Sequence, residues 1–358
     1  MQKEYGSNFC EELQKSGGLL EDSDGRLFFD SGRSALRYLL DFLGARIERV
    51  LLPQYDCESV LEPFIERNYR ISYYPVDRYF RPCGKELRRL VEKEKPQLIL
   101  VQAYFGFDTL ADERDFLADI RKQGVTVIED ITHSLFLSSL KDCSDYRFAS
   151  LRKWCAIPDG GILLGPQKHF PSVSPGMREN TEFVTERIEA QRQKREYFAR
   201  GDGEAPKGFI ALYDRSEALL DIQKNYYTMS LYTRERIASL EREKIISSRR
   251  SCYDVLKGAL SRVPYIEIIY PDLPENAVPL YFPVYISPDK RDRLRLRMRE
   301  KGIFLPVIWP LPTVLGETVS DGVRDIYNKI LAIPCDQRYT GKDMRFIADV
   351  IKQEIELC

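Results

Sequence analysis

The sequence predicts an α/β fold: a three-layer, mostly parallel sheet followed by a smaller C-terminal α+β domain. Strand-like apolar segments alternate with amphipathic helical segments between residues 26 and 130. The expected strands are continuously apolar, which is typical of parallel strands that are buried on both faces. The chain has 358 residues, enough for one large and one small domain. We expect the large domain at 1–240, including an N-terminal arm, and the small domain at 241–358.

The first half of the chain carries the alternation most clearly. Short apolar runs predict strands, and segments with apolar residues at helical spacing lie between them. Gly44 and Gly124 end two of these helices. Ligands on such sheets bind at the carboxyl ends of the strands, so residues just after the strands are candidates for a site. We expect strands at 26–30, 50–53, 71–77, 97–106 and 125–130, and helices at 34–44, 59–68, 85–95 and 112–124.

The order of elements changes after residue 165. Residues 182–200 predict a helix whose many charges form a solvated face. Residues 229–262 predict one long helix, of a length that suits a connection between two domains. The remainder predicts a compact α+β unit, with strands at 279–286, 304–310 and 331–339 and helices at 291–302 and 343–355.

Composition excludes several classes of function. A net charge of −1 gives no general attraction to nucleic acids or acidic membranes. No apolar run approaches the length of a membrane span, and the polar N-terminus is unlike a secretory signal. The eight cysteines lack C-x-x-C spacing and suggest reduced thiols of a cytoplasmic protein. With only two histidines in the chain, we expect no metal centre.

Lys153 and Asp130 form the most informative pair of residues. Asp130 ends the expected strand at 125–130, and Lys153 follows in the stretch RKWCAIPDGGILLG. An enzyme that uses pyridoxal 5'-phosphate (PLP) needs one amine to hold the aldehyde of the cofactor and one carboxylate to keep the ring nitrogen protonated. Keeping that nitrogen protonated at neutral pH takes about 3 kcal/mol, which a buried charge-assisted hydrogen bond can supply. The alternatives are an ordinary surface lysine and an aspartate that caps the next turn.

A phosphate cradle is expected at the start of the helix at 34–44. Ser31, Gly32, Arg33 and Ser34 precede or open this helix. Backbone N–H groups at a helix start, together with two hydroxyls, are suited to bind a phosphate. Arg33 either adds a charged contact to the phosphate or points to solvent. The alternative is a serine cap without any ligand.

These motifs together resemble the DegT/DnrJ/StrS group of sugar aminotransferases, within the fold-type I PLP-dependent enzymes. The resemblance covers nearly the whole chain in the same order. It implies that the active site of a homodimer binds PLP through Lys153, Asp130 and the helix start at Gly32. Its motifs are SGRSAL at 31–36, PQYDC at 53–57, EDITH at 129–133, KWCAIPDGG at 153–161, Met229-Ser230 and Arg249-Arg250.

The resemblance also implies roles for residues at which this chain departs from the family. His133 stands where the family has a glutamine near the ring oxygen of the cofactor, and an imidazole can donate a hydrogen bond there. Ser150 lies three residues before Lys153 and could reach the phosphate, although the family places its serine two residues earlier. Cys57 occupies the position of the aromatic residue that stacks on the cofactor ring. Tyr55 or Tyr104 could stack instead, or each could belong to the core.

Substrate contacts are expected from three further residues. Tyr226 lies where the family has a loop that reaches the neighbouring subunit. Trp309 aligns with a substrate segment of the family in which Ile308 here replaces a histidine. Arg338 could clamp a carboxylate with two hydrogen bonds or simply pin a loop.

The function that this pattern favours is a PLP-dependent aminotransferase. It would move an amino group from an amino acid such as glutamate to a keto sugar of the nucleotide-sugar type, as the resemblance implies. Lys153 would then act as the general acid and base. Two alternatives stay open: another PLP-dependent reaction such as a lyase, and a protein of the same fold that binds PLP without turnover.

Overall fold

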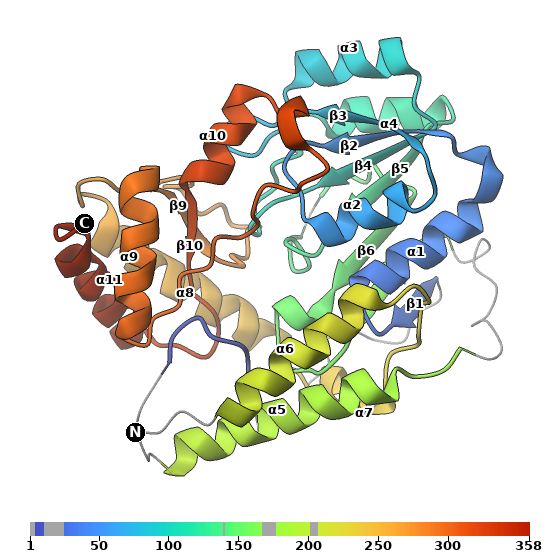
Figure 1. Cartoon of the computed structure of the whole chain (residues 1–358). Helices are drawn as coiled ribbons and strands as arrows, with labels where there is room; N and C mark the ends of the chain where they lie inside the picture. Colours follow the sequence, from blue (N-terminus) through green and yellow to red (C-terminus); the bar gives the residue numbers. More distant parts are fainter. Residues whose placement is uncertain (1–3, 11–24, 139, 167–176, 201–206) are drawn as a thin grey trace. The chain divides into compact units, whose positions relative to one another are not determined.

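A computed structural model describes residues 4–10, 25–138, 140–166, 177–200 and 207–358 (Figure 1). Within these ranges the chain falls into two compact units, which we describe separately. The first unit comprises Asn8–Gly44 and Asp145–Arg242, and the second comprises Glu4–Ser7, Ala45–Ser144 and Glu243–Cys358. These units do not test the predicted boundary between a large domain at 1–240 and a small domain at 241–358, which stays a prediction.

The central sheet has seven strands in the order β1-β7-β6-β5-β4-β2-β3. β5, β4, β2 and β3 pair in parallel, whereas β1, β7 and β6 pair antiparallel. This mostly parallel sheet confirms the predicted fold class. Its strands are β1 (Arg26–Phe29), β2 (Arg49–Pro53), β3 (Arg70–Tyr74), β4 (Leu98–Gln102), β5 (Thr126–Asp130), β6 (Tyr146–Ser150) and β7 (Gly161–Leu164).

Parallel strands of the second unit place polar residues at their carboxyl ends. All five residues of β4 are buried, as the continuous apolar run predicts. Gln102, the last residue of β4, is in register with Asp130, the last residue of β5. Figure 1 shows α3 and α4 on one side of these strands and α2 on the other. The bounds of these helices are Glu58–Ile65 for α2, Gly84–Glu94 for α3 and Arg114–Lys122 for α4.

The C-terminal part of the second unit forms a small α+β structure. Its three strands are antiparallel, in the order β10-β9-β8. The last helix begins with a capping box, in which the side chains of Thr340 and Asp343 each accept a hydrogen bond from the other residue's backbone N–H. The elements are α8 (Arg242–Leu260), β8 (Glu267–Ile268), β9 (Phe282–Tyr285), α9 (Pro288–Glu300), α10 (Asp321–Lys329), β10 (Ile330–Ile333) and α11 (Gly341–Ile355).

One expectation for this part is wrong, and one helix was not predicted. The segment 304–310 is not a strand, and its neighbour Ile303 forms only an isolated bridge with Tyr5. Prolines at 306 and 310 explain this, because each removes a backbone donor from a possible ladder. The sequence analysis also missed helix α10, whose apolar residues Val323, Ile326 and Tyr327 are buried on one face.

In its described residues, the first unit consists of the antiparallel strands with four helices, α1 (Gly32–Leu43), α5 (Thr181–Arg200), α6 (Lys207–Ile222) and α7 (Leu231–Ala238). α5 and α6 lie side by side (Figure 1) and share apolar clusters such as Ala190, Tyr197, Phe209 and Tyr213. The charged helix predicted at 182–200 is confirmed as α5, whereas α6 was missed.

The single long helix expected at 229–262 is wrong, because the stretch forms two helices, α7 and α8. The break falls at Ser239, whose hydroxyl donates a hydrogen bond to the carbonyl of Arg236. A serine that bonds the local backbone in this way competes with the helical pattern. Among the described residues, no helix combines the length and the apolar character that a membrane crossing would require.

Candidate functional site

Lys153 ends a single 3₁₀ turn, Leu151–Lys153, that directly follows β6. The turn is closed on both sides by backbone hydrogen bonds, from Leu151 N to the Gly160 carbonyl and from Trp154 N to the Leu151 carbonyl. Leu151 and Trp154 are fully buried, whereas Lys153 itself is exposed. A buried frame therefore holds the backbone of this lysine and leaves its side chain accessible.

The helix start expected to cradle a phosphate lies against the lysine turn. Ser31 caps α1 and accepts a hydrogen bond from Ser34 N at 3.1 Å. A Cβ atom added to Gly32 would lie 3.2 Å from the Ser150 nitrogen, and one added to Gly161 would overlap the Ser31 carbonyl oxygen. The first unit therefore brings together Gly32, Ser34 and Ser150, with Lys153 three residues further on. N–H groups at such a helix start favour an anion.

Two buried carboxyl groups support this region and were missed by the sequence analysis. Asp30 accepts a hydrogen bond from the Ser31 hydroxyl at 3.2 Å, and burial raises its pKa. Asp159 accepts hydrogen bonds from both the backbone and the hydroxyl of Ser230 at 2.7 Å, and burial raises its pKa to about 6. Asp159 thereby ties the loop after Lys153 to the start of α7. In the sequence, the position of Asp159 directly before Gly160-Gly161 was the signal that could have indicated its importance.

The arginines of the first unit bind protein groups. Arg33 donates to the Leu220 carbonyl at 2.9 Å and forms an ion pair with Asp221 at 3.1 Å, both at the end of α6. These contacts show neither of the two roles expected for Arg33, which were a contact with phosphate and exposure to solvent. The contact with phosphate stays a prediction. Arg152 pairs with Glu217 at 2.8 Å. Burial alone would raise the pKa of Glu217, but the neighbouring arginines lower it to about 2.

Asp130 lies in the second unit, where β5 ends at the carboxyl edge of its sheet. Its side chain is 3% exposed and accepts a hydrogen bond from Thr132 N at 2.7 Å. The preceding residue, Glu129, bonds instead to Arg114 at 3.2 Å and to Ser144 at 3.3 Å. The two acids therefore use different partners, as expected for neighbours on a strand.

His133 belongs to an aromatic cluster of the second unit. Its ring stacks on Trp309, with centroids 5.0 Å apart and planes inclined by 15°. Tyr55 is fully buried and its ring lies 5.3 Å from that of Trp309. Tyr104 is also buried and donates a hydrogen bond to the Tyr55 carbonyl at 2.6 Å. The second unit therefore brings His133, Trp309, Tyr55 and Tyr104 together, whereas their roles toward a ring stay predictions.

Several buried polar atoms of this unit have no hydrogen-bond partner within the described part of the chain. Such atoms are costly unless a ligand or water satisfies them. They follow or end the parallel strands, which is the edge where ligands bind in α/β folds. They are Tyr55 Oη, Asp56 Oδ2, Gln102 Oε1 and Ser134 Oγ. Of these four residues, only Tyr55 is predicted from the sequence as a candidate site residue.

The remaining predicted residues have definite surroundings. Cys57 is half-buried, with its Sγ 3.1 Å from the Ser59 hydroxyl. Tyr226 packs edge-on against Tyr38, with ring centroids 5.3 Å apart, in the first unit. Arg338 forms two hydrogen bonds with Asp336 and one with the Ser7 carbonyl. Those contacts support the alternative in which Arg338 pins a loop.

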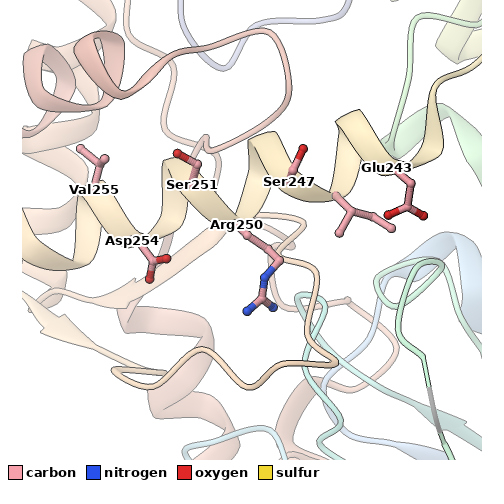
Figure 2. A pocket seen from close by; sticks show the side chains of 7 residues that line it. Glu243, Ser247, Arg250, Ser251, Asp254 and Val255 are labelled. Carbon is pink, nitrogen blue, oxygen red and sulfur yellow. The ribbon is translucent and has the colours of Figure 1, made fainter.

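A shallow depression lies along α8 in the second unit (Figure 2). Arg250, one of its lining residues, donates hydrogen bonds to the carbonyls of Pro274 and Glu275. None of the predicted site residues lines it. The lining residues are Glu243, Ile246, Ser247, Arg250, Ser251, Asp254 and Val255.

Comparisons with known proteins identify the fold. No protein-family model and no curated protein matches the sequence, but many solved structures are similar. PseC of Helicobacter pylori, an aminotransferase involved in the biosynthesis of pseudoaminic acid, has a TM-score of 0.68 at 14% identity, over 99% of this chain and 100% of that protein. A DegT/DnrJ/EryC1/StrS aminotransferase from Brucella abortus has a TM-score of 0.60 at 16% identity, with coverages of 92% and 85%.

A third similar structure was solved with its cofactor. It is Spr1654 of Streptococcus pneumoniae, a candidate sugar aminotransferase in its PLP form, with a TM-score of 0.64 at 11% identity and coverages of 93% and 87%. The chain therefore has the fold of these aminotransferases over nearly its whole length. At such identities the likeness establishes the fold, and activity has to be argued from the site.

Proposed function

We propose that this protein is a PLP-dependent aminotransferase that transfers an amino group from an amino acid such as glutamate to a keto sugar. The observation that carries the proposal is the packing of Gly32 and Ser150 in the first unit, which joins a helix start suited to an anion to the turn that presents Lys153. A buried acceptor for a ring nitrogen, Asp130, and a set of unsatisfied polar atoms in the second unit support it. So does the shared fold.

The residues present fit PLP. The N–H groups of the α1 start and the hydroxyls of Ser34 and Ser150 would hold its phosphate, and Asp130 would accept a hydrogen bond from its ring nitrogen. His133, held by Trp309, would donate to the ring oxygen. When bound, PLP supplies an electron sink for the carbon from which a proton is removed.

Lys153 carries the proton transfers in this proposal. Its amine would hold the aldehyde group of PLP, and Nζ would hold and move the proton when it is not so engaged. The frame of Leu151 and Trp154 keeps its backbone in place throughout. Binding the cofactor through Lys153 and Asp130 requires no metal.

The proposal includes a homodimer in the cytoplasm, as for the enzymes that the sequence resembles. Tyr226 would then be a candidate to contact the neighbouring subunit. Light scattering after size-exclusion chromatography measures the mass in solution. A mass of one chain in the presence of PLP would contradict the dimer without touching the assignment of Lys153.

The decisive experiment is covalent trapping of the cofactor. Purified protein incubated with PLP should turn yellow, lose that absorbance on borohydride treatment, and yield a modified peptide that contains Lys153. Glutamate should convert the absorbance to that of the aminated cofactor, and a nucleotide-linked keto sugar should restore it. Label on another lysine, or absorbance that no amino donor changes, would contradict the proposal; elimination products would indicate a lyase.

A further inference from the structure

Asp56 is a second buried carboxyl group near Asp130, in the same unit. It follows the end of β2 by three residues and is 0% exposed. Its Oδ1 accepts a hydrogen bond from Cys57 N at 2.7 Å. Its Oδ2 has no hydrogen-bond partner within the residues that the structure describes. One oxygen of this carboxyl is therefore satisfied and the other is not.

Three of the tyrosines around Asp56 use their hydroxyls elsewhere. Tyr74 donates to the Leu100 carbonyl at 3.0 Å, and Tyr104 donates to the Tyr55 carbonyl at 2.6 Å. Tyr327 lies 3.1 Å from the Gln54 carbonyl and accepts from Asp56 N at 3.0 Å, so its proton serves the backbone. None of these three hydroxyls therefore donates to the carboxyl of Asp56.

Charges around Asp56 also oppose its ionisation. No lysine or arginine in the described part of the chain bonds to it. Burial raises its pKa well above the usual range, and the like charge of Asp130 raises it further. A fully buried carboxylate with one donor is unfavourable compared with the neutral acid. The titratable groups that face Asp56 are Asp130 and the phenols of Tyr73, Tyr74, Tyr104 and Tyr327.

The carboxyl groups of Asp130 and Asp56 therefore differ in their surroundings. Asp130 accepts the Thr132 N–H and lies at the strand end, where a donor on a ligand could reach it. When two carboxyl groups interact, one proton can remain with the pair, and the less solvated member keeps it. Here that member is Asp56, which is 0% exposed against 3% for Asp130 and whose Oδ2 has no hydrogen-bond partner among the described residues.

We propose that Asp56 is a neutral carboxylic acid in the folded protein at neutral pH, and that it acts as a positioning residue by leaving the negative charge of the pair on Asp130. This inference rests on the proposed function for the use that is made of Asp130. The neutral acid also offers a hydrogen-bond donor at Oδ2, beside an aspartate that offers an acceptor. Asparagine has nearly the same shape and is neutral, so Asp56→Asn is the matched replacement.

The first test is infrared spectroscopy of the protein without cofactor at pH 7.5. A protonated carboxyl has a carbonyl stretching band above the amide region. Wild type minus Asp56→Asn should show the loss of one such carboxyl, whereas wild type minus Asp130→Asn should not. If Asp56→Asn fails to fold, Asp56→Ser is compared instead, because its hydroxyl can still accept from Cys57 N. An unchanged band in a folded Asp56 variant would overturn the inference.

The second test is the pH dependence of thermal unfolding, again without cofactor. A carboxyl whose pKa is higher in the folded state stabilises the fold at low pH, and that contribution is lost as pH rises above the unfolded value near ~4. The asparagine variant has no proton to lose at this position, so the melting temperature of Asp56→Asn relative to wild type should rise between pH 5 and pH 7.5. A difference that is constant or falls over this range would overturn the inference.

With PLP bound, the pH titration of the cofactor absorbance supplies a third readout. Asp56→Asn should leave its midpoint where wild type has it, and Asp130→Asn should shift it. A protein that takes up no PLP would defeat the proposed function but leave both measurements without cofactor standing. A missing carboxylic acid band would defeat the inference even in a protein that binds PLP and turns over substrate.

Discussion

The two compact units carry different kinds of candidate residues. Around Lys153, in the first unit, hydrogen bonds and ion pairs link side chains of different elements: Asp159 bonds to Ser230, and Arg152 pairs with Glu217. The part of the second unit that contains Asp130 has an aromatic cluster, and several of its buried polar atoms have no hydrogen-bond partner among the described residues. Both units contain such atoms, among them Asp30 Oδ2 and Arg152 Nε in the first, and a buried polar atom without a partner is costly unless a ligand or water satisfies it. The two units thus differ in the residues that they carry: the first has the lysine turn and the helix start at Gly32, and the second has Asp130 and an aromatic cluster.

Removal of Lys153 should have the largest effect on activity. Lys153→Ala should lower turnover by about 10³-fold or more, because the group that binds the cofactor and moves the proton is lost. Thermal unfolding should change little, since the side chain is exposed and its neighbours hold the turn. Lys122→Ala, at another exposed lysine, is the control and should behave as wild type. A comparable loss of turnover in both variants would contradict a specific role for Lys153.

Two neighbouring acids of β5, in the second unit, should have different roles, one in activity and the other in stability. Asp130→Asn should lower turnover by about 10²-fold or more while the protein stays folded, because a neutral amide holds the ring nitrogen less well. Glu129→Gln should instead destabilise the fold by about 2 kcal/mol, since buried Arg114 loses part of its charge pairing. Steady-state kinetics and urea unfolding separate the two effects. Equal changes in both variants would contradict a specific role for Asp130.

The close contact at Gly32 tests the anion cradle. A methyl group at Gly32 would lie 3.2 Å from Ser150 N, a tight contact that Gly32→Ala relieves only if the helix start and the end of β6 move apart by a few tenths of an ångström. We expect PLP to bind about tenfold more weakly, as measured by equilibrium dialysis. Gly258→Ala is the matched control, because no atom lies within 4 Å of the added methyl. That replacement should raise stability by about 0.5–1 kcal/mol and leave PLP affinity unchanged.

Much of this architecture could be predicted from the sequence, because its strands carry continuous apolar runs and its glycines mark the ends of helices. Lys153, Asp130 and the helix start at Gly32 were found because each stands in a recognisable local pattern. Asp56 and Asp159 were missed because their importance comes from burial, which depends on segments distant in the sequence. Helix α6 lay in a part of the chain that the pattern analysis left without an assignment, and Ser239 broke a helix that composition alone would continue.

A smaller effect, on stability instead of activity, should come from Asp159. Its pKa is raised to about 6 by burial, above the value near 4 of an unfolded chain. The folded protein therefore keeps a proton there that the unfolded chain loses, and stability should fall as pH rises from about 4 through about 6, by up to about 3 kcal/mol. Asp159→Asn removes the titration, so urea unfolding at pH 4.5 and 7.5 should show a smaller fall than in wild type. An equal fall in both proteins would show that burial of Asp159 carries no such cost, and the contrast between the units would then depend on the aromatic cluster of the second unit alone.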